Sequence, residues 1–232
     1  MNKRLEALRR LIPEGLGVID VGTDHGYLPV QLVRDGYEGK IFASDIRPGP
    51  LSAARKTAEK AGADDRITFL LCDGLDACPP DRIDTIVIAG MGGDTICGIL
   101  DRAEWCMSPE YELLLQPMTK SEVLRFWLVN NGFTIEKEEL AKDGGKLYQL
   151  LCARFCGVNT PLTDAELYLG AYERMAGHPL FPAYLEQQKQ VFQKRLLALS
   201  SSGAADAGTL RLLRQILDEV RTMEERLHDE GL

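Results

Sequence analysis

The alternation of short apolar runs with helical patterns between residues 17 and 155 constrains the fold of this chain more than any other feature. The runs typical of strands are 17–22, 40–45, 66–74, 81–90 and 111–117, and the segments typical of helices are 27–36, 48–63, 93–103 and 121–132. Strands and helices at this spacing form stacked βαβ units, with helices on both faces of a parallel sheet. The sequence therefore predicts an α/β fold.

Residues 133–155 differ because two strand patterns follow each other with no helix between them. They are joined by Asp143-Gly144-Gly145, a combination that favours a tight turn between antiparallel strands. With the five earlier strands, this terminal hairpin makes seven. A Rossmann-like sheet of seven strands that ends in a hairpin suits an S-adenosylmethionine (SAM)-dependent methyltransferase better than a plain dinucleotide-binding protein.

The pattern changes after Gly157. Residues 158–166 resemble a linker, and Thr163 followed by Glu166 predicts a capping box that opens a helix to about residue 176. Two further helices, at about 182–199 and 209–228, are expected to pack as an antiparallel coiled-coil hairpin. The predicted seam consists of Leu185, Phe192, Leu196 and Leu199 on one helix and Leu210, Leu213, Leu217, Val220 and Leu227 on the other.

We therefore predict two domains, 1–156 and 157–232. Helical periodicity alone leaves the role of the second domain open. The hairpin is either a packing device or oligomer contact, or an arm that recognises a substrate. The oligomeric state is expected to be a monomer or a weak dimer.

Composition restricts the class of protein. The chain has 232 residues, is 45% hydrophobic and 27% charged, and carries a formal net charge of −8, which is typical of a globular protein with a substantial core. No apolar run approaches the roughly 18–20 residues of a membrane span, and the charged N-terminal segment lacks the apolar part of a signal peptide. We expect a cytoplasmic protein with no membrane partner. The net charge itself does not favour a nucleic-acid partner, although a local basic patch is compatible with one.

The cysteines indicate neither a metal site nor disulfides. None of the six belongs to a CxxC pair, and their scattered spacing is unlike that of structural zinc ligands. Cys152 and Cys156 fall on one predicted strand, four residues apart, so both are expected to face the core. The sequence predicts no bound metal.

The segment VIDVGTDHGYLP, residues 18–29, is the most informative about a ligand. A predicted strand ends at Asp20, and Gly22 and Gly26 permit a tight turn before the helix. Asp24 stands where the dinucleotide fingerprint GxGxxG has its second glycine. Carboxylates here repel a pyrophosphate but attract the ammonium group of SAM.

Four further strand ends are expected to line the same crevice. Asp45 follows Gly26 by 19 residues, the spacing at which an acid accepts hydrogen bonds from ribose hydroxyls, and Asp73-Gly74 can accept from the amino group of adenine. The glycines of residues 88–94 leave room for a ligand against bare backbone, and Gln116 offers a polar side chain. Since the carboxyl ends of parallel strands share one edge, these groups are expected to lie together.

The strings DVGTDHGYLP, CDGL, IAGMGG and LQP, followed by LRFWLVNNGFTIEKEEL, resemble the TrmK family of bacterial tRNA (adenine-N1)-methyltransferases. The resemblance covers about residues 1–156, and a helical tail is similar too. Met118 departs from the pattern, in which asparagine follows LQP. The resemblance implies that SAM methylates N1 of adenine 22 in the D-arm of tRNA. It assigns cofactor roles to Asp20, Gly22, Asp24, Asp45, Asp73 and Gly74.

The sequence thus yields three sets of candidate residues. The candidates for binding SAM are Asp20, Gly22, Thr23, Asp24, Gly26, Asp45, Ile46, Asp73, Gly74, Ala89 and Gly90. The candidates at the reacting centre are Asp24, His25, Met91 and Gln116. The candidates for tRNA contact are Tyr27, which could stack on a flipped base, and the cations Lys189, Lys194, Arg195, Arg211 and Arg214. Lys3, Arg4, Arg9 and Arg10 form a further basic cluster.

Other functions remain compatible with these patterns. One is a methyltransferase for a small molecule or a protein. Another is a SAM-binding regulator or scaffold, with a helical arm that binds a protein partner. A dinucleotide oxidoreductase is disfavoured by the acidic residues in the turn.

Overall fold

The structure is a computed structural model that describes residues 3–202 and 206–231. Within these residues a single sheet of seven strands has the order β3-β2-β1-β4-β5-β7-β6. The strands are β1 Gly17–Val21, β2 Lys40–Asp45, β3 Ile67–Leu71, β4 Thr85–Gly92, β5 Glu112–Thr119, β6 Phe133–Asp143 and β7 Lys146–Phe155. The first five pair in parallel, and β7 lies antiparallel between β5 and β6. This topology confirms the predicted methyltransferase-type sheet with its terminal hairpin.

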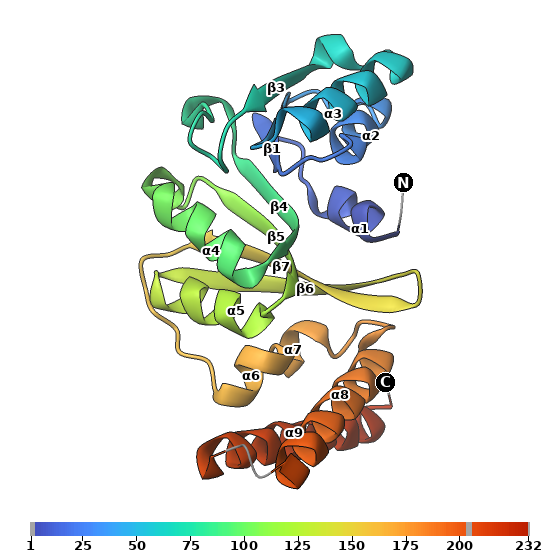
Figure 1. Ribbon diagram of the computed structural model, residues 1–232, viewed down its shortest axis with the longest axis vertical. Coiled ribbons are helices and arrows are strands. Elements are labelled where there is room, and N and C mark those ends of the chain that lie inside the picture. The colour runs from blue at the N-terminus through green and yellow to red at the C-terminus, as the bar shows by residue number, and fades with distance from the viewer. Residues whose placement is uncertain (1–2, 203–205, 232) are drawn as a thin grey trace.

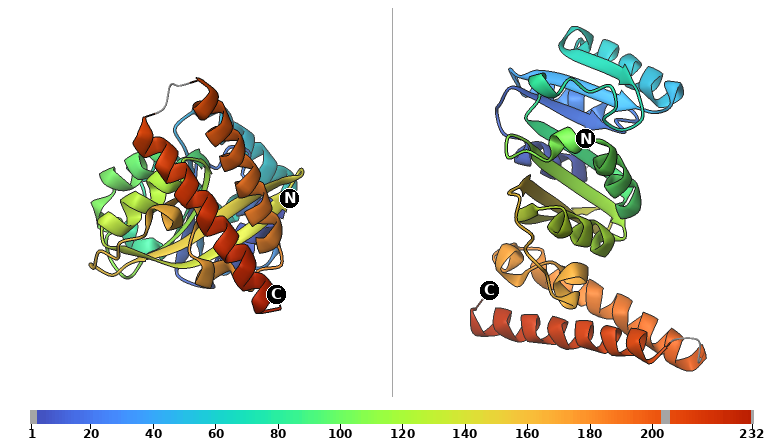
Figure 2. Two further views of the ribbon diagram at one scale, coloured as in Figure 1. Left: turned by 90° about the horizontal axis from the view of Figure 1, so that it is seen from below. Right: turned by 90° about the vertical axis from the view of Figure 1, so that its left-hand side faces the viewer.

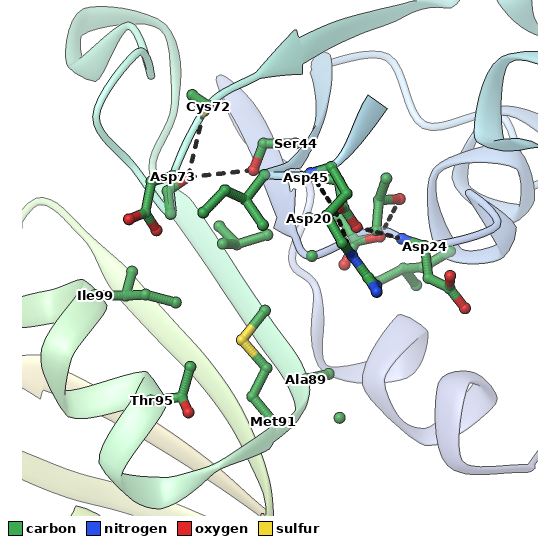
Figure 3. A pocket seen from close by; sticks show the side chains of 18 of the residues that line it. Asp20, Asp24, Ser44, Asp45, Cys72, Asp73, Ala89, Met91, Thr95 and Ile99 are labelled. Atoms are coloured by element: carbon green, nitrogen blue, oxygen red, sulfur yellow. Dashed lines mark hydrogen bonds and ion pairs between the residues drawn. The ribbon is translucent and has the colours of Figure 1, made fainter. Parts of the chain in front are cut away.

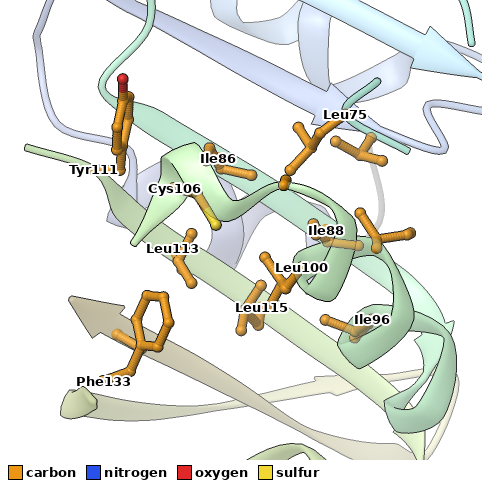
Figure 4. Close-up of a cluster of buried hydrophobic side chains, with 14 of the residues drawn as sticks. Leu75, Ile86, Ile88, Ile96, Leu100, Cys106, Tyr111, Leu113, Leu115 and Phe133 are labelled. Atoms are coloured by element: carbon orange, nitrogen blue, oxygen red, sulfur yellow. The ribbon is translucent and has the colours of Figure 1, made fainter. Parts of the chain in front are cut away.

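Helices cover both faces of the sheet (Figure 1). They are α1 Lys3–Leu11, α2 Tyr27–Arg34, α3 Pro48–Ala61, α4 Gly93–Arg102 and α5 Ser121–Asn130, with short 3-10 turns η1 Asp64–Arg66, η2 Pro80–Arg82 and η3 Glu104–Cys106. Successive side chains of β4 point to opposite faces of the sheet. Val87 packs in the cluster under α1–α3, whereas Ile86 and Ile88 pack under α4 and α5. Figure 4 shows this second cluster, where Ile96 and Leu100 of α4 meet β4 and β5.

The tail consists of α6 Asp164–Leu169, α7 Tyr172–Met175, α8 Phe181–Ser202 and α9 Ala207–Asp229. Thr163 and Glu166 form the predicted capping box. The expected single helix to residue 176 is wrong, because Gly170 interrupts it with a φ of 83°. The carboxylate of Glu138 lies against this glycine and accepts a hydrogen bond from Ala171 N at 3.3 Å, so a contact from the sheet ends the helix.

Helices α8 and α9 form the predicted antiparallel hairpin (Figure 2). The buried residues of α9 recur at the expected heptad spacing. They include Ile216 and Met223, which the predicted seam did not contain. Leu210 and Leu217, which the predicted seam included, are only partly buried. The seam is displaced because α9 packs against α6 as well as α8. Its buried residues are Leu213, Ile216, Val220, Met223 and Leu227.

The tail packs directly on the outer strand of the sheet. The buried cluster at the centre of α6–α9 also contains Leu140 of β6, with Leu147 of β7 packed against it. The division of the chain into domains 1–156 and 157–232 remains a prediction.

All six cysteines are free thiols. Cys152 is buried in β7 as expected, but Cys156 is exposed just beyond the end of that strand, so the prediction of a core position is wrong for it. In the part of the chain that the structure describes, no group of His, Cys, Asp or Glu side chains could hold a metal ion. No helix there is both long and apolar enough to cross a membrane.

Candidate functional site

A cavity of about 800 Å³ opens at the carboxyl edge of the sheet, above the ends of β1, β2 and β4 (Figure 3). Its walls contain all the candidates for SAM binding except Gly26, and also His25, Tyr27 and Met91. Several other residues also line the cavity that were not candidates from the sequence: Arg4, Ser44, Arg47, Cys72, Thr95, Ile99 and Arg102. Ser44, Arg47 and Cys72 adjoin the predicted strand ends at Asp45 and Asp73, whereas Arg4, Thr95, Ile99 and Arg102 reach the cavity only through the fold.

The turn after β1 is held tightly against β2. The backbone N–H groups of Gly22 and Thr23 both donate to Ser44 O, at 2.8 and 2.9 Å. Gly22 has a φ of 71°, and a Cβ on it would overlap Cε of Met91. Met91 therefore forms a wall of the cavity directly beside the turn, and the positive φ favours glycine at position 22.

Asp20 is a buried carboxylate at the base of this turn. Its Oδ2 accepts a hydrogen bond from Thr23 Oγ1 at 2.7 Å. Burial raises the pKa of Asp20 from 3.8 to about 6, although the Thr23 hydrogen bond and the positive charge of Arg4 both act to lower it. A cationic ligand group beside Asp20 would stabilise its ionised form.

Asp45 ends β2 and is only 5% exposed. Its Oδ1 accepts from Arg47 N at 2.9 Å, and its Oδ2 lies 3.4 Å from the backbone nitrogen of Asp24, which donates to it. Asp24 has a φ of 52°, which is uncommon for a residue other than glycine. The carboxylate of Asp45 thus stabilises the strained turn and has acceptor capacity left for a ligand.

Asp73 lies across the cavity from Asp24 (Figure 3), and Gly74 lines the cavity as well. Asp73 pairs with Arg102 at 2.8 Å, and both side chains are about half exposed. Gly74 has a φ of 58°, and a Cβ on it would lie 2.8 Å from Cγ2 of Ile99. Ile99 therefore forms an apolar wall next to the backbone of Gly74.

The rim carries Asp24, His25 and Tyr27. His25 Nε2 lies 3.7 Å from Asp24 Oδ2, with both side chains more than half exposed. The His25 and Tyr27 rings stack with centroids 5.5 Å apart, and Tyr27 is 52% exposed. The geometry leaves a flat aromatic surface at the entrance of the cavity.

Gln116 is fully buried and does not line the cavity. Its Oε1 accepts a hydrogen bond from Arg4 Nη1 at 2.5 Å, and its Nε2 donates to Pro117 O at 2.8 Å. Arg4, which does line the cavity, therefore stands between Gln116 and any ligand.

The other candidates for tRNA contact lie on the hairpin, at the opposite end of the molecule from α2 and α3 (Figure 1). Lys189 is engaged in an ion pair with Glu224 at 2.9 Å, which joins α8 to α9. The remaining cations are exposed and form no ion pair with any residue that the structure describes: Lys194, Arg195, Arg211 and Arg214.

Residues 1–151 match a family model described as a methyltransferase domain. The chain is 29% identical to the tRNA (adenine(22)-N(1))-methyltransferase of Bacillus subtilis over 195 residues, which cover 84% of this chain and 79% of that protein. Streptococcus pneumoniae Sp1610, solved in complex with S-adenosyl-L-methionine, matches with a TM-score of 0.81 at 28% identity, covering 95% of this chain and 98% of that one. M. capricolum TrmK, solved with the cofactor product S-adenosyl-homocysteine (SAH), matches with a TM-score of 0.74 at 25% identity and covers 98% of both chains.

Proposed function

Because this chain belongs to the methyltransferase-domain family, we propose that it transfers the methyl group of SAM to N1 of adenine 22 in tRNA. The main support for this proposal is the cavity at the carboxyl edge of the sheet, where buried carboxylates surround a glycine turn. The choice of tRNA as substrate is supported by the B. subtilis relative. It is also supported by the match to TrmK, which extends through the helical tail.

The residues around the cavity fit SAM. A buried carboxylate at Asp20 suits the cationic amino-acid end of the cofactor. Asp45, with unused acceptor capacity, suits the ribose hydroxyls, and Asp73 suits the amino group of the adenine ring. Gly22 allows the backbone to approach the ligand closely. We assign the remaining lining candidates, Thr23, Ile46, Ala89 and Gly90, to the same site, and Gly26 to the turn that supports it.

SAM supplies an electrophilic methyl group, and the protein has to align the acceptor with it. N1 of neutral adenine carries a free lone pair, so the reaction requires no base to deprotonate the nucleophile. The residues therefore act by position and by charge. Tyr27 stacks on the flipped base at the entrance, and Gly90 and Met91 shape the wall that faces it. The carboxylate of Asp24, oriented beside His25, stabilises the positive charge that develops on the base.

Contacts with the rest of the tRNA need cations away from the cavity. Lys194, Arg195, Arg211 and Arg214 are exposed on the hairpin and are assigned this role. Lys189 contributes less because it is engaged with Glu224. A tRNA substrate also favours the cytoplasmic location expected from the sequence.

The direct test treats unmodified tRNA with the protein and SAM and locates the added methyl group by mass spectrometry. We expect one methyl group at N1 of adenine 22 and none on a matched tRNA with guanine at that position. Methylation of a protein or small molecule in place of tRNA would instead identify a methyltransferase for that class of substrate. SAM binding without turnover on any RNA would favour a regulator or scaffold.

A further inference from the structure

A second hollow lies beside the cofactor cavity, between helices α2 and α3. The two helices lie side by side on one face of the sheet (Figure 1). The hollow is a groove of about 330 Å³, and its lining includes Tyr27, Val30, Gln31 and Arg34 of α2 and Thr57 and Lys60 of α3. Tyr27 also lines the cofactor cavity. This α2–α3 groove therefore begins at the rim of the cavity and shares a wall with it.

The shape of the groove follows from the packing of the two helices. At one end they are in close contact, since a Cβ on Gly26 would lie 3.0 Å from Cβ of Ala54. Val30 is only 4% exposed and forms an apolar part of the lining. Thr57 Oγ1 donates to Ala53 O at 3.0 Å, which leaves the lone pairs of its hydroxyl oxygen available to accept. The groove thus combines an apolar surface with polar groups from both helices.

The charged side chains that line the groove are both cations. Arg34 lies in the last turn of α2 and Lys60 in the last turn of α3, and both are exposed. Neither forms an ion pair with a residue in the described ranges 3–202 and 206–231. The neighbouring acid Asp35 instead accepts from Arg9 at 2.9 Å and from Gln31 at 2.7 Å. The groove therefore presents two positive charges that no ion pair within the described chain balances.

The ligand that complements this surface is a nucleic-acid backbone. A phosphodiester chain carries one negative charge per nucleotide, and its oxygen atoms accept hydrogen bonds from guanidinium and ammonium groups. In RNA each ribose adds a 2′-hydroxyl, which can donate to an acceptor such as Thr57 Oγ1. We propose that the α2–α3 groove binds the tRNA backbone directly beside the flipped adenine, with Arg34 and Lys60 on its phosphates. This inference rests on the proposed methylation of tRNA.

The place of the groove assigns it to nucleotides next to the methylated one. The base enters the cavity past Tyr27, which is 52% exposed, and the groove begins at the same side chain. The cations of the α8–α9 hairpin lie at the opposite end of the molecule from α2 and α3, so they contact other parts of the tRNA (Figure 1). Phosphate contacts set the register of a nucleic acid without reading its bases. Arg34 and Lys60 are therefore positioning residues for the flipped nucleotide.

The test compares two double variants, Arg34→Ala with Lys60→Ala and, as the matched control, Arg82→Ala with Lys40→Ala. The control removes the same two kinds of side chain from exposed positions at the amino edge of the sheet, where Lys40 begins β2 and Arg82 precedes β4. Binding of unmodified tRNA is measured with SAH present over a series of salt concentrations, and SAH affinity is measured separately by calorimetry.

We expect the groove variant to bind tRNA about 10- to 100-fold more weakly than the wild type at low salt, the range for the loss of charged hydrogen bonds. The slope of log K against log salt should fall by about 1.4–1.8, because two phosphate contacts are lost. In steady-state assays the change should fall on the KM for tRNA rather than on kcat. SAH affinity should be unchanged, and the control should match the wild type in every measurement.

Ethylation of individual tRNA phosphates locates the contact. In the wild type, ethylation of the phosphates directly beside adenine 22 should interfere with binding. In the groove variant that interference should disappear, whereas interference at remote phosphates should persist. Arg34→Gln with Lys60→Gln, which keeps long polar side chains on both helices, should give the same result and guards against misfolding of the alanine variant.

Four results would overturn the groove as a site for RNA. Equal salt slopes in the groove variants and the control would show that its cations bind no phosphate. Interference lost only at phosphates remote from adenine 22 would contradict its place beside the flipped base. A parallel loss of SAH affinity in both groove variants would assign Arg34 and Lys60 a structural role. If the wild type methylates adenine 22 and the groove variants do so with an unchanged KM, the groove fails while the proposed function stands. If the wild type neither binds nor methylates tRNA, both fail.

Discussion

The guanidinium of Arg125 and the carboxylate of Glu138 meet at 2.7 Å with both side chains fully buried. Their remaining contacts come from the tail: Arg125 Nη1 donates to Leu167 O at 2.9 Å, and Glu138 accepts from Arg174 at 3.2 Å. The pair therefore joins helix α5 and strand β6 to helices α6 and α7 of the tail. A fragment that ended near residue 157 would lose the tail partners of both charges, so the role of the tail is better tested by point variants.

Glu138→Gln should lower the free energy of unfolding by about 3–5 kcal/mol, because it leaves the Arg125 charge buried without its counterion. Urea unfolding followed by circular dichroism measures this change. Glu136→Gln is the control on the same strand, where the side chain is 49% exposed. It should change stability by no more than about 0.5 kcal/mol. Similar losses of unfolding free energy in the two variants would contradict a distinct contribution of the buried Arg125–Glu138 pair to stability.

The affinity for SAH should depend on pH through Asp20. The pKa of this carboxyl is raised to about 6 in the free protein, so it is largely protonated below pH 6 and has to ionise to bind an ammonium group. Affinity should therefore fall as pH decreases below about 6 and level off above about 7. Calorimetry between pH 5 and pH 8 measures the profile. Asp20→Asn should bind weakly and without this dependence, and an unchanged profile in that variant would assign the effect to another group.

Asp45→Asn should weaken SAM binding by about 1–3 kcal/mol, because the ribose hydroxyls lose a charged acceptor. The amide keeps the size of the side chain, which matters since Asp45 also accepts from the backbone of Asp24 and Arg47. Asp65→Asn, on an exposed acid in η1, is the control and should bind SAM normally. A folded Asp45→Asn protein with unchanged affinity would remove this residue from the site.

Replacing Lys194, Arg195, Arg211 and Arg214 together by alanine should raise the KM for tRNA and flatten the salt dependence of binding, with unchanged SAM affinity. Removing one phosphate-binding cation should reduce the slope of log K against log salt by about 0.7–0.9. Arg221→Ala is the control on α9, because this arginine pairs with Asp218 at 3.0 Å. A slope unchanged by the quadruple substitution would contradict RNA binding by the hairpin and favour a packing role.

The sequence alone determined the features that depend on local geometry. The alternation of strand and helix patterns predicted the sheet and its hairpin, because periodicity follows from backbone dihedral angles within a few residues. Thr163 and Glu166 predicted their capping box for the same reason. The acids and glycines of residues 20–26 predicted a turn at the cavity, since the carboxyl ends of parallel strands share one edge.

Only the tertiary structure decided the features that depend on which distant segments meet. Arg4 and Gln116 are 112 residues apart, and no local pattern links them. Gly170 ends a helix because Glu138 of β6 reaches it, and the buried face of α9 runs through Ile216 and Met223 because α6 packs there too. Each of these contacts forms only when the assembled fold brings remote side chains together. Its energy comes from burial and pairing in that assembled environment, which the local sequence does not encode.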